Sequence, residues 1–151
     1  MSVNPRIEEV PAWVSVGVRQ VARMDELSTV FPAAYERVSA AIGAAGGQLV
    51  GPAYARYFGM PRDTVDVEIG FGVAGPIDVP GLVVTQNPAF KAAIGTHVGP
   101  YAALPDAYGE LMTWIGDQQV RTTDEMFEFY DSMPDELPES TVTRMVFPLA
   151  S

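Results

Sequence analysis

The chain has 151 residues, of which 48% are hydrophobic and 19% charged; these values are typical of one globular domain and exclude a disordered protein. The 9 basic and 19 acidic side chains give a net charge of -10, which argues against general nucleic-acid binding and against docking on anionic membranes. With no cysteine and a single histidine, His97, disulfides, thiolate metal sites and two-histidine motifs are excluded. We expect neither a metal nor a cofactor.

No apolar run reaches the roughly 18–20 residues of a membrane-spanning helix. The first residues, MSVNPRIEEVP, are acidic and interrupted by proline, unlike a signal peptide. We therefore expect a cytoplasmic protein that does not contact membranes.

In the first half, the pattern predicts a strand, a helix and two strands. Valines alternate with small or polar residues over 13–23, which is typical of a strand. From Asp25, apolar residues recur at three- and four-residue steps until the glycines near residue 46, which predicts an amphipathic helix. Two further strands are expected at 48–58 and 65–73, joined by a hairpin.

The second half repeats this order after a connector rich in glycine and proline at 74–81. A strand is expected at 90–97, a helix at 104–115, and two strands at 126–130 and 142–149.

The helices of the two halves also resemble each other in sequence. FPAAYERVSAAIG from Phe31 aligns without gaps with LPDAYGELMTWIG from Leu104, and the same offset of 73 residues relates Tyr57 to Tyr130. Chance similarity between two amphipathic helices is the alternative. We interpret the chain as one domain, residues 1–151, built from pseudo-two-fold halves at about 10–75 and 82–150.

Two strand–helix–strand–strand units predict an α+β fold: an antiparallel sheet with two helices on one face and a groove between the helices. Ligand pockets tend to form at such junctions. The six tyrosines, seven phenylalanines, two tryptophans and seven methionines could line it, because aromatic walls attract planar and cationic ligands and methionine adapts to many shapes. Packing in the core is the alternative for each of them.

The strand around Glu68 has an unusual pattern. Val65, Val67, Ile69, Phe71 and Val73 share one face, whereas Asp66, Glu68, Gly70 and Gly72 share the other. Glycines beside a glutamate leave room for a ligand, and the carboxylate would then pair with a cation or act as a general base. A solvated sheet face is the alternative.

Other polar residues are weaker candidates for a functional role. His97 is either a proton shuttle or, as we expect, a cap that hydrogen-bonds the following turn. Solvated surface charges are expected at Asp106, Glu110, Asp124, Glu125 and Glu128.

Several short motifs together resemble the GyrI-like, or gyrase-inhibitor-like, superfamily of small-molecule-binding domains. They are THVGPY from Thr96 with the helix after it, VDVEIGF from Val65, GPAYARY from Gly51 and the closing FPL from Phe147. The resemblance covers nearly the whole chain. It implies tandem strand–helix–strand–strand repeats with a ligand groove between them, and ligands that are often lipophilic, aromatic and cationic.

The family includes effector-binding domains of multidrug regulators, stand-alone proteins, and a branch that hydrolyses cyclopropane-containing alkylating toxins. Many members carry a glutamate on the last strand, where this sequence is expected to place Arg144. An arginine there would favour anionic or neutral ligands, and we expect it to pair with Glu68. If the protein is a regulator module, DNA binding would come from a partner chain.

We therefore expect a stand-alone protein that binds a lipophilic aromatic compound in the groove, for sensing or for toxin sequestration. The alternatives are a hydrolase of the toxin-degrading branch, with Glu68, Tyr57 and Tyr101 as acid and base, and a protein–protein module that modulates gyrase. The ligand-binding candidates are Tyr57, Glu68, Phe71, Tyr101, Tyr108, Met112, Trp114, Phe127, Arg144 and Phe147.

Overall fold

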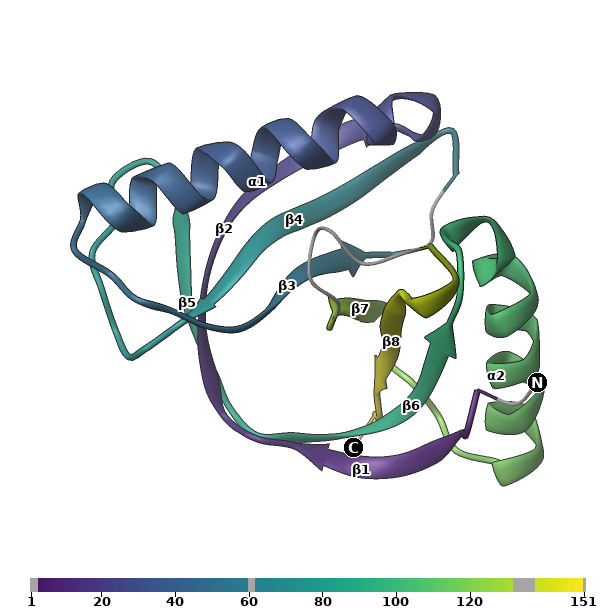
Figure 1. Cartoon of the computed structure of the whole chain (residues 1–151). Coiled ribbons are helices and arrows are strands. Elements are labelled where there is room, and N and C mark those ends of the chain that lie inside the picture. The colour runs from purple at the N-terminus through teal and green to yellow at the C-terminus, as the bar shows by residue number, and fades with distance from the viewer. Residues whose placement is uncertain (1–2, 60–61, 132–137, 151) are drawn as a thin grey trace.

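The computed structural model describes residues 3–59, 62–131 and 138–150, which form one eight-stranded sheet and two α-helices (Figure 1). The strands are β1 (Arg6–Val10), β2 (Trp13–Arg23), β3 (Leu49–Phe58), β4 (Thr64–Val73), β5 (Val83–Asn87), β6 (Phe90–Val98), β7 (Glu125–Tyr130) and β8 (Val142–Pro148). The helices are α1 (Leu27–Ala44) and α2 (Leu104–Gln118), with short 3-10 turns η1 (Met24–Glu26), η2 (Tyr101–Ala103) and η3 (Pro138–Ser140).

All neighbouring strands are antiparallel, in the order β1-β6-β8-β7-β3-β4-β2-β5. The strands of the first half, β2-β4-β3, meet those of the second half, β7-β8-β6, at the β3–β7 pair. The sheet is strongly curled, with the helices outside the curl (Figure 1). Its middle strands therefore lie between α1 and α2.

Each helix packs on its own half of the sheet with residues four apart. In α1 the buried side chains are those of Ala34, Val38 and Ile42, and in α2 those of Ala107, Leu111 and Ile115. Such spacing places three side chains on one helix face. The helix α1 contacts β2 and β4, and α2 contacts β6, which leaves β3 and β7 between them.

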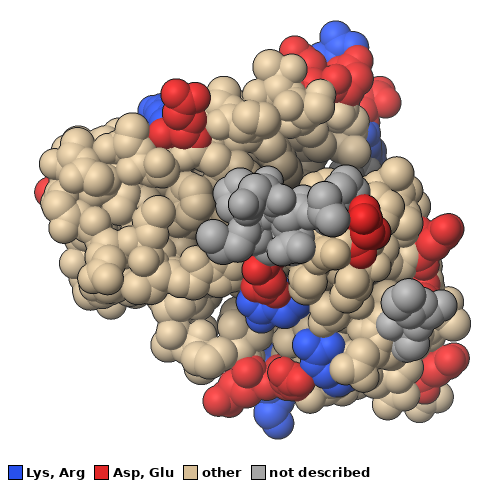
Figure 2. All heavy atoms as spheres, viewed as in Figure 1, with Lys and Arg blue, Asp and Glu red and all other residues tan. Residues whose placement is uncertain are grey.

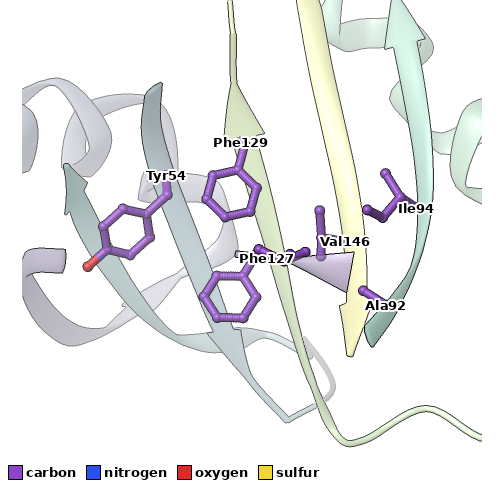
Figure 3. Packing of buried hydrophobic residues seen from close by; sticks show 7 residues of the cluster. Tyr54, Ala92, Ile94, Phe127, Phe129 and Val146 are labelled. Carbon is purple, nitrogen blue, oxygen red and sulfur yellow. The ribbon is translucent and has the colours of Figure 1, made fainter. Parts of the chain in front are cut away.

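The inner face of the curl has an aromatic core of its own. Tyr54, Phe127 and Phe129 pack with Val146 and two residues of β6, as Figure 3 shows. The two phenylalanine rings stack at 5.7 Å between centroids, and Trp13 stands edge-on against Tyr54 at 5.0 Å. The sheet is thus apolar on both faces, so its middle strands cannot show the simple alternation of a half-solvated sheet.

Gly70, beside Glu68 on the same strand face, serves the close packing of β2 on β4 and leaves no room for a ligand there, contrary to the expectation. A Cβ added at Gly70 would lie 1.9 Å from the Val16 carbonyl oxygen. One added at Gly17, the strand partner of Gly70, would lie 2.6 Å from the Tyr54 hydroxyl. Only glycine fits at these two positions, because any side chain would collide with the neighbouring strand.

The predicted fold class is confirmed: the protein is α+β, with an antiparallel sheet and two helices. The predicted strands and helices lie close to their expected residues. The edge strands β1 and β5 were not predicted, and the chain before Trp13 therefore already contains a strand. Both have only 5 residues and pair on one side only, so neither needs a long alternating pattern.

Candidate functional site

The candidate site is built around Glu128, in the middle of β7. Along this strand Met126, Glu128 and Tyr130 face the helices, whereas Phe127 and Phe129 face the inside of the curl. Opposite Glu128 lie Ala55 on β3 and Met145 on β8, both fully buried. The residue is only 8% exposed, so a carboxylate is held in an otherwise apolar layer between the helices.

Tyrosine hydroxyls satisfy this carboxylate. Tyr130 donates a hydrogen bond to Oε1 of Glu128 at 2.5 Å, and Tyr108 donates one to Oε2. None of the ion pairs found among residues 3–59, 62–131 and 138–150 involves Glu128. The carboxylate is therefore hydrogen-bonded, but a neighbouring cation does not balance its charge in the described part of the chain.

Five tyrosines gather around Glu128, and we call them the tyrosine cluster. They come from both helical layers and from the strands between them: Tyr35 of α1, Tyr57 of β3, Tyr101 of η2, Tyr108 of α2 and Tyr130 of β7. The Tyr130 ring stands edge-on to the Tyr35 and Tyr101 rings, at 6.5 and 6.3 Å between centroids. Tyr101 is 55% exposed, so it lies on the solvent-facing side of the cluster.

The tyrosine hydroxyls are held in their protonated form. Burial, and secondly the negative charge of Glu128, raises the pKa of Tyr108 and of Tyr130. Burial likewise raises the pKa of Tyr35, Tyr57 and Tyr101, and Glu128 adds to the increase in each. The cluster therefore presents hydroxyl donors and ring faces around one negative charge, an arrangement suited to an organic cation.

Charged side chains are unevenly spread over the surface. Figure 2 shows acidic and basic groups over β1 and over α1, mainly at its right-hand end, and acidic groups over α2, whereas the left-hand side of this view is almost free of charge. None of the residues between Arg37 and Arg56 is charged. The net charge therefore does not define the ligand; the local charge of Glu128 is more informative.

Five of the predicted site residues lie on the helix-covered face with the cluster. Tyr57, Tyr101 and Tyr108 belong to it. Phe71 contacts the Tyr35 ring at 5.4 Å, and Phe147 contacts the Tyr108 ring at 6.2 Å. Both phenylalanines thus pack against tyrosine rings of the cluster.

The other predicted residues lie apart from it. Trp114 packs in the core under α2, and Met112 is 46% exposed on that helix. Phe127, Glu68 and Arg144 lie on the inner face of the curl, on the other side of the sheet.

The expected pairing of Glu68 with Arg144 is wrong. Glu68 is 2% exposed and accepts a hydrogen bond from the Tyr54 hydroxyl. Arg144 forms a bidentate pair with Asp131, with N–O distances of 2.6 and 3.1 Å, and lies 4.9 Å from the centre of the Phe129 ring. Since Arg144 faces away from the tyrosine cluster, it does not argue against cationic ligands there.

Sequence reasoning missed Glu128, Tyr35 and Tyr130. Glu128 was expected to be a solvated charge and is buried instead, because both faces of β7 are covered. A signal was present: Tyr35 and Tyr108 occupy matching places in the two helix sequences, as do Tyr57 and Tyr130 in the strands. All four meet at Glu128.

The expected role of His97 as a cap is confirmed. Its Nε2 lies 3.0 Å from the Pro100 carbonyl oxygen, across the turn at Gly99, whose φ is +138°. This contact fixes the start of η2, and hence the place of Tyr101.

Within the described ranges, no three His, Asp or Glu side chains converge as metal ligands do, and no helix is long and apolar enough to cross a membrane.

The curled antiparallel sheet with two outer helices agrees with the fold that the sequence motifs implied. A family model, the GyrI-like small molecule binding domain, matches residues 3–150. The chain belongs to this GyrI-like family, as its sequence motifs had suggested. Among curated proteins, none matches the sequence at a significant level.

Solved structures show the same fold. The C-terminal domain of EcmrR is similar with a TM-score of 0.83 at 21% identity, over 98% of both chains. In the complex of EcmrR with DNA, the similarity covers 98% of this chain and 57% of the regulator, with a TM-score of 0.86 at 20% identity.

Two further structures are similar at lower identity. SAV2435 bound to tetraphenylphosphonium has a TM-score of 0.73 at 13% identity, over 98% of this chain and 94% of that one. A hydrolase from Listeria innocua has a TM-score of 0.67 at 14% identity, over 99% and 93%. These identities are low enough that the likeness concerns the fold.

Proposed function

We propose that this protein binds a lipophilic aromatic cation between its two helices, with the charge of the ligand against Glu128 and its rings against the tyrosine cluster. The single observation that carries the proposal is the buried Glu128 carboxylate, held by Tyr108 and Tyr130 without an ion pair in the described chain. A buried charge is costly unless it is balanced, so a cation that reaches it gains more than it would in water.

The surroundings of Glu128 support an aromatic ligand. Tyrosine rings attract cations through their faces, by about 0.5–2 kcal/mol each. Tyr101, which is half-exposed, contacts the cluster through the ring of Tyr130 and is not part of the buried core. SAV2435, which shares the fold, was solved with the aromatic cation tetraphenylphosphonium, and this compound is therefore a suitable first probe.

A thermal-shift screen tests the proposal. Ligands that bind the folded state raise the melting temperature by mass action. We expect tetraphenylphosphonium and other aromatic cations to raise it, and uncharged compounds of the same shape to have little effect. A screen in which neutral analogues stabilise the protein as well as the cations do would refute a role for the Glu128 charge.

Hydrolysis of cyclopropane-containing alkylating toxins is the second candidate. For this reaction we propose Glu128 as the carboxylate in place of Glu68, because Glu68 lies on the other side of the sheet from Tyr57 and Tyr101. Incubation of wild type and Glu128→Gln with such a toxin, followed by analysis of the products, separates the candidates. Turnover that depends on Glu128 supports hydrolysis, whereas an intact toxin supports binding alone.

As a sensor, the protein would act through a DNA-binding partner chain, and as a sequestering protein it would act alone. EcmrR, whose C-terminal domain shares the fold, has been solved on DNA. The gyrase-directed role stays a prediction from the family resemblance.

A further inference from the structure

We propose that the inner face of the curled sheet carries a second ligand site, which takes a small planar aromatic compound bearing a hydrogen-bond acceptor such as a carboxylate. This site lies on the other side of the sheet from the tyrosine cluster, and it does not depend on the function proposed above.

A cavity of about 260 Å³ opens at the corner where β1 passes into β2. Its walls come from this corner, from the irregular start of β3 and from the end of β4, together with Phe129 and Arg144. Apolar cavities of about 150 Å³ already hold benzene, so this volume suits one or two fused rings. The mouths of curled or closed sheets are common places for ligands.

The walls favour a flat aromatic molecule. Trp13 lines the cavity and is packed edge-on against Phe129 at 5.5 Å. Val50, which also lines the cavity, is 43% exposed. An aromatic ring would therefore find stacking partners and would cover apolar surface that water now contacts.

One side chain of the cavity wall explains the preference for an acceptor. Arg144 lines the cavity, and its pair with Asp131 uses only Nε and Nη2. A guanidinium has five N–H donors, so others remain for a ligand.

The inner-face site and the tyrosine cluster have opposite charge preferences. Glu128 faces the helices with no ion pair in the described chain, whereas the inner cavity is lined by Arg144, which is paired with Asp131 and keeps N–H donors for a ligand. They are separated by a single strand, since Phe129 and its neighbours Glu128 and Tyr130 point to opposite sides of β7.

The indole N–H signals in nuclear magnetic resonance spectra give a direct test, because the protein has only two tryptophans. Trp114 packs under α2 on the outer side, and the variant Trp114→Phe assigns the two signals. We expect titration with benzoate, and more weakly with benzamide, to shift the Trp13 signal and leave that of Trp114 in place. The absence of a Trp13 shift with both probes at millimolar concentration overturns the proposal.

Two variants locate the binding. Ala12→Phe, at an exposed residue of the cavity wall, should fill the space and abolish the effect of both probes. Arg144→Gln should weaken benzoate about tenfold, the usual worth of a charge-assisted hydrogen bond, and change benzamide much less. Asp106→Asn, at an exposed residue of α2, is the control and should leave benzoate binding unchanged. Benzoate binding that survives both Ala12→Phe and Arg144→Gln contradicts the site.

Discussion

At the scale of residues, Glu128 is a buried charge that destabilises the fold and that we propose as the binding group for a cation. It is buried among apolar neighbours, with tyrosine hydroxyls as hydrogen-bond donors and no ion pair in the described chain. Hydrogen bonds offset part of the cost of burying a charge, and an opposite charge would offset more. We therefore expect a cation placed against Glu128 to stabilise the folded protein.

The variant Glu128→Gln tests this cost. The amide is uncharged and keeps a hydrogen-bond acceptor for the tyrosines, so the free energy of unfolding should stay within about 1 kcal/mol of wild type or increase. Denaturant unfolding of the ligand-free protein measures it. A loss of more than about 3 kcal/mol would show that the carboxylate is a structural group.

The chemistry of this residue could not be predicted from the sequence. In EMFEFY the two glutamates look alike, yet Glu125 pairs with Arg56 on the inner face and Glu128 lies under the helices. Their difference comes from the strands and helices that cover each face, which are distant in sequence. The expectation for Arg144 failed in the same way, because its partner, Asp131, lies on the neighbouring segment.

At the scale of elements, the sheet depends on glycines at two positions where strands approach closely. Gly17 and Gly70 face each other on β2 and β4, and a side chain at either would collide with backbone or with Tyr54. Gly109, inside α2, has no such close neighbour: a Cβ added there would meet nothing within 4 Å.

This contrast gives a matched pair of variants. Gly70→Ala should destabilise the protein by at least about 2–3 kcal/mol, because the Val16 carbonyl cannot move without breaking the strand pair. Gly109→Ala should instead raise stability by about 0.5–1 kcal/mol, the usual gain in a helix interior. Thermal or denaturant unfolding measures both. Equal effects of the two substitutions would contradict the close packing of β2 on β4.

The elements that the sequence predicted well are those with long, one-sided patterns. The helices α1 and α2 show apolar spacing over more than three turns, and β2 shows a clear alternation at its start. The edge strands β1 and β5 lack such patterns, since each pairs on one side and is short. The duplication of the two halves stays a prediction, although their elements follow the same order.

At the scale of the whole molecule, the fold brings tyrosines from the two halves of the chain together in one cluster. Tyr35 and Tyr57 come from the first half, Tyr101, Tyr108 and Tyr130 from the second, and they converge where β3 pairs with β7. Assembly of the cluster therefore requires both halves of the chain to fold together, and its tyrosines report on the integrity of the fold.

Alkaline titration of the tyrosines tests whether the cluster is buried in the folded protein. Burial raises the pKa of all six tyrosines, those of the cluster and Tyr54. Since the folded state keeps protons that the unfolded chain loses near pH 10, the free energy of unfolding should be unaffected by these groups below about pH 10 and should fall as the pH rises above it.

We expect tyrosinate absorbance to appear together with the loss of helical circular dichroism, with the half-exposed Tyr101 ionising first. Ionisation of most tyrosines near pH 10, while the circular dichroism stays native, would contradict the buried cluster.

The central claim is that Glu128 binds the charge of an aromatic cation, and calorimetric titration with tetraphenylphosphonium tests it most directly. Wild type should bind this cation, and Glu128→Gln should bind it at least about tenfold more weakly, as expected for loss of a buried charge interaction. Glu125→Gln, on the other face of the same strand, is the control and should bind like wild type. Equal affinity of wild type and Glu128→Gln would contradict the account.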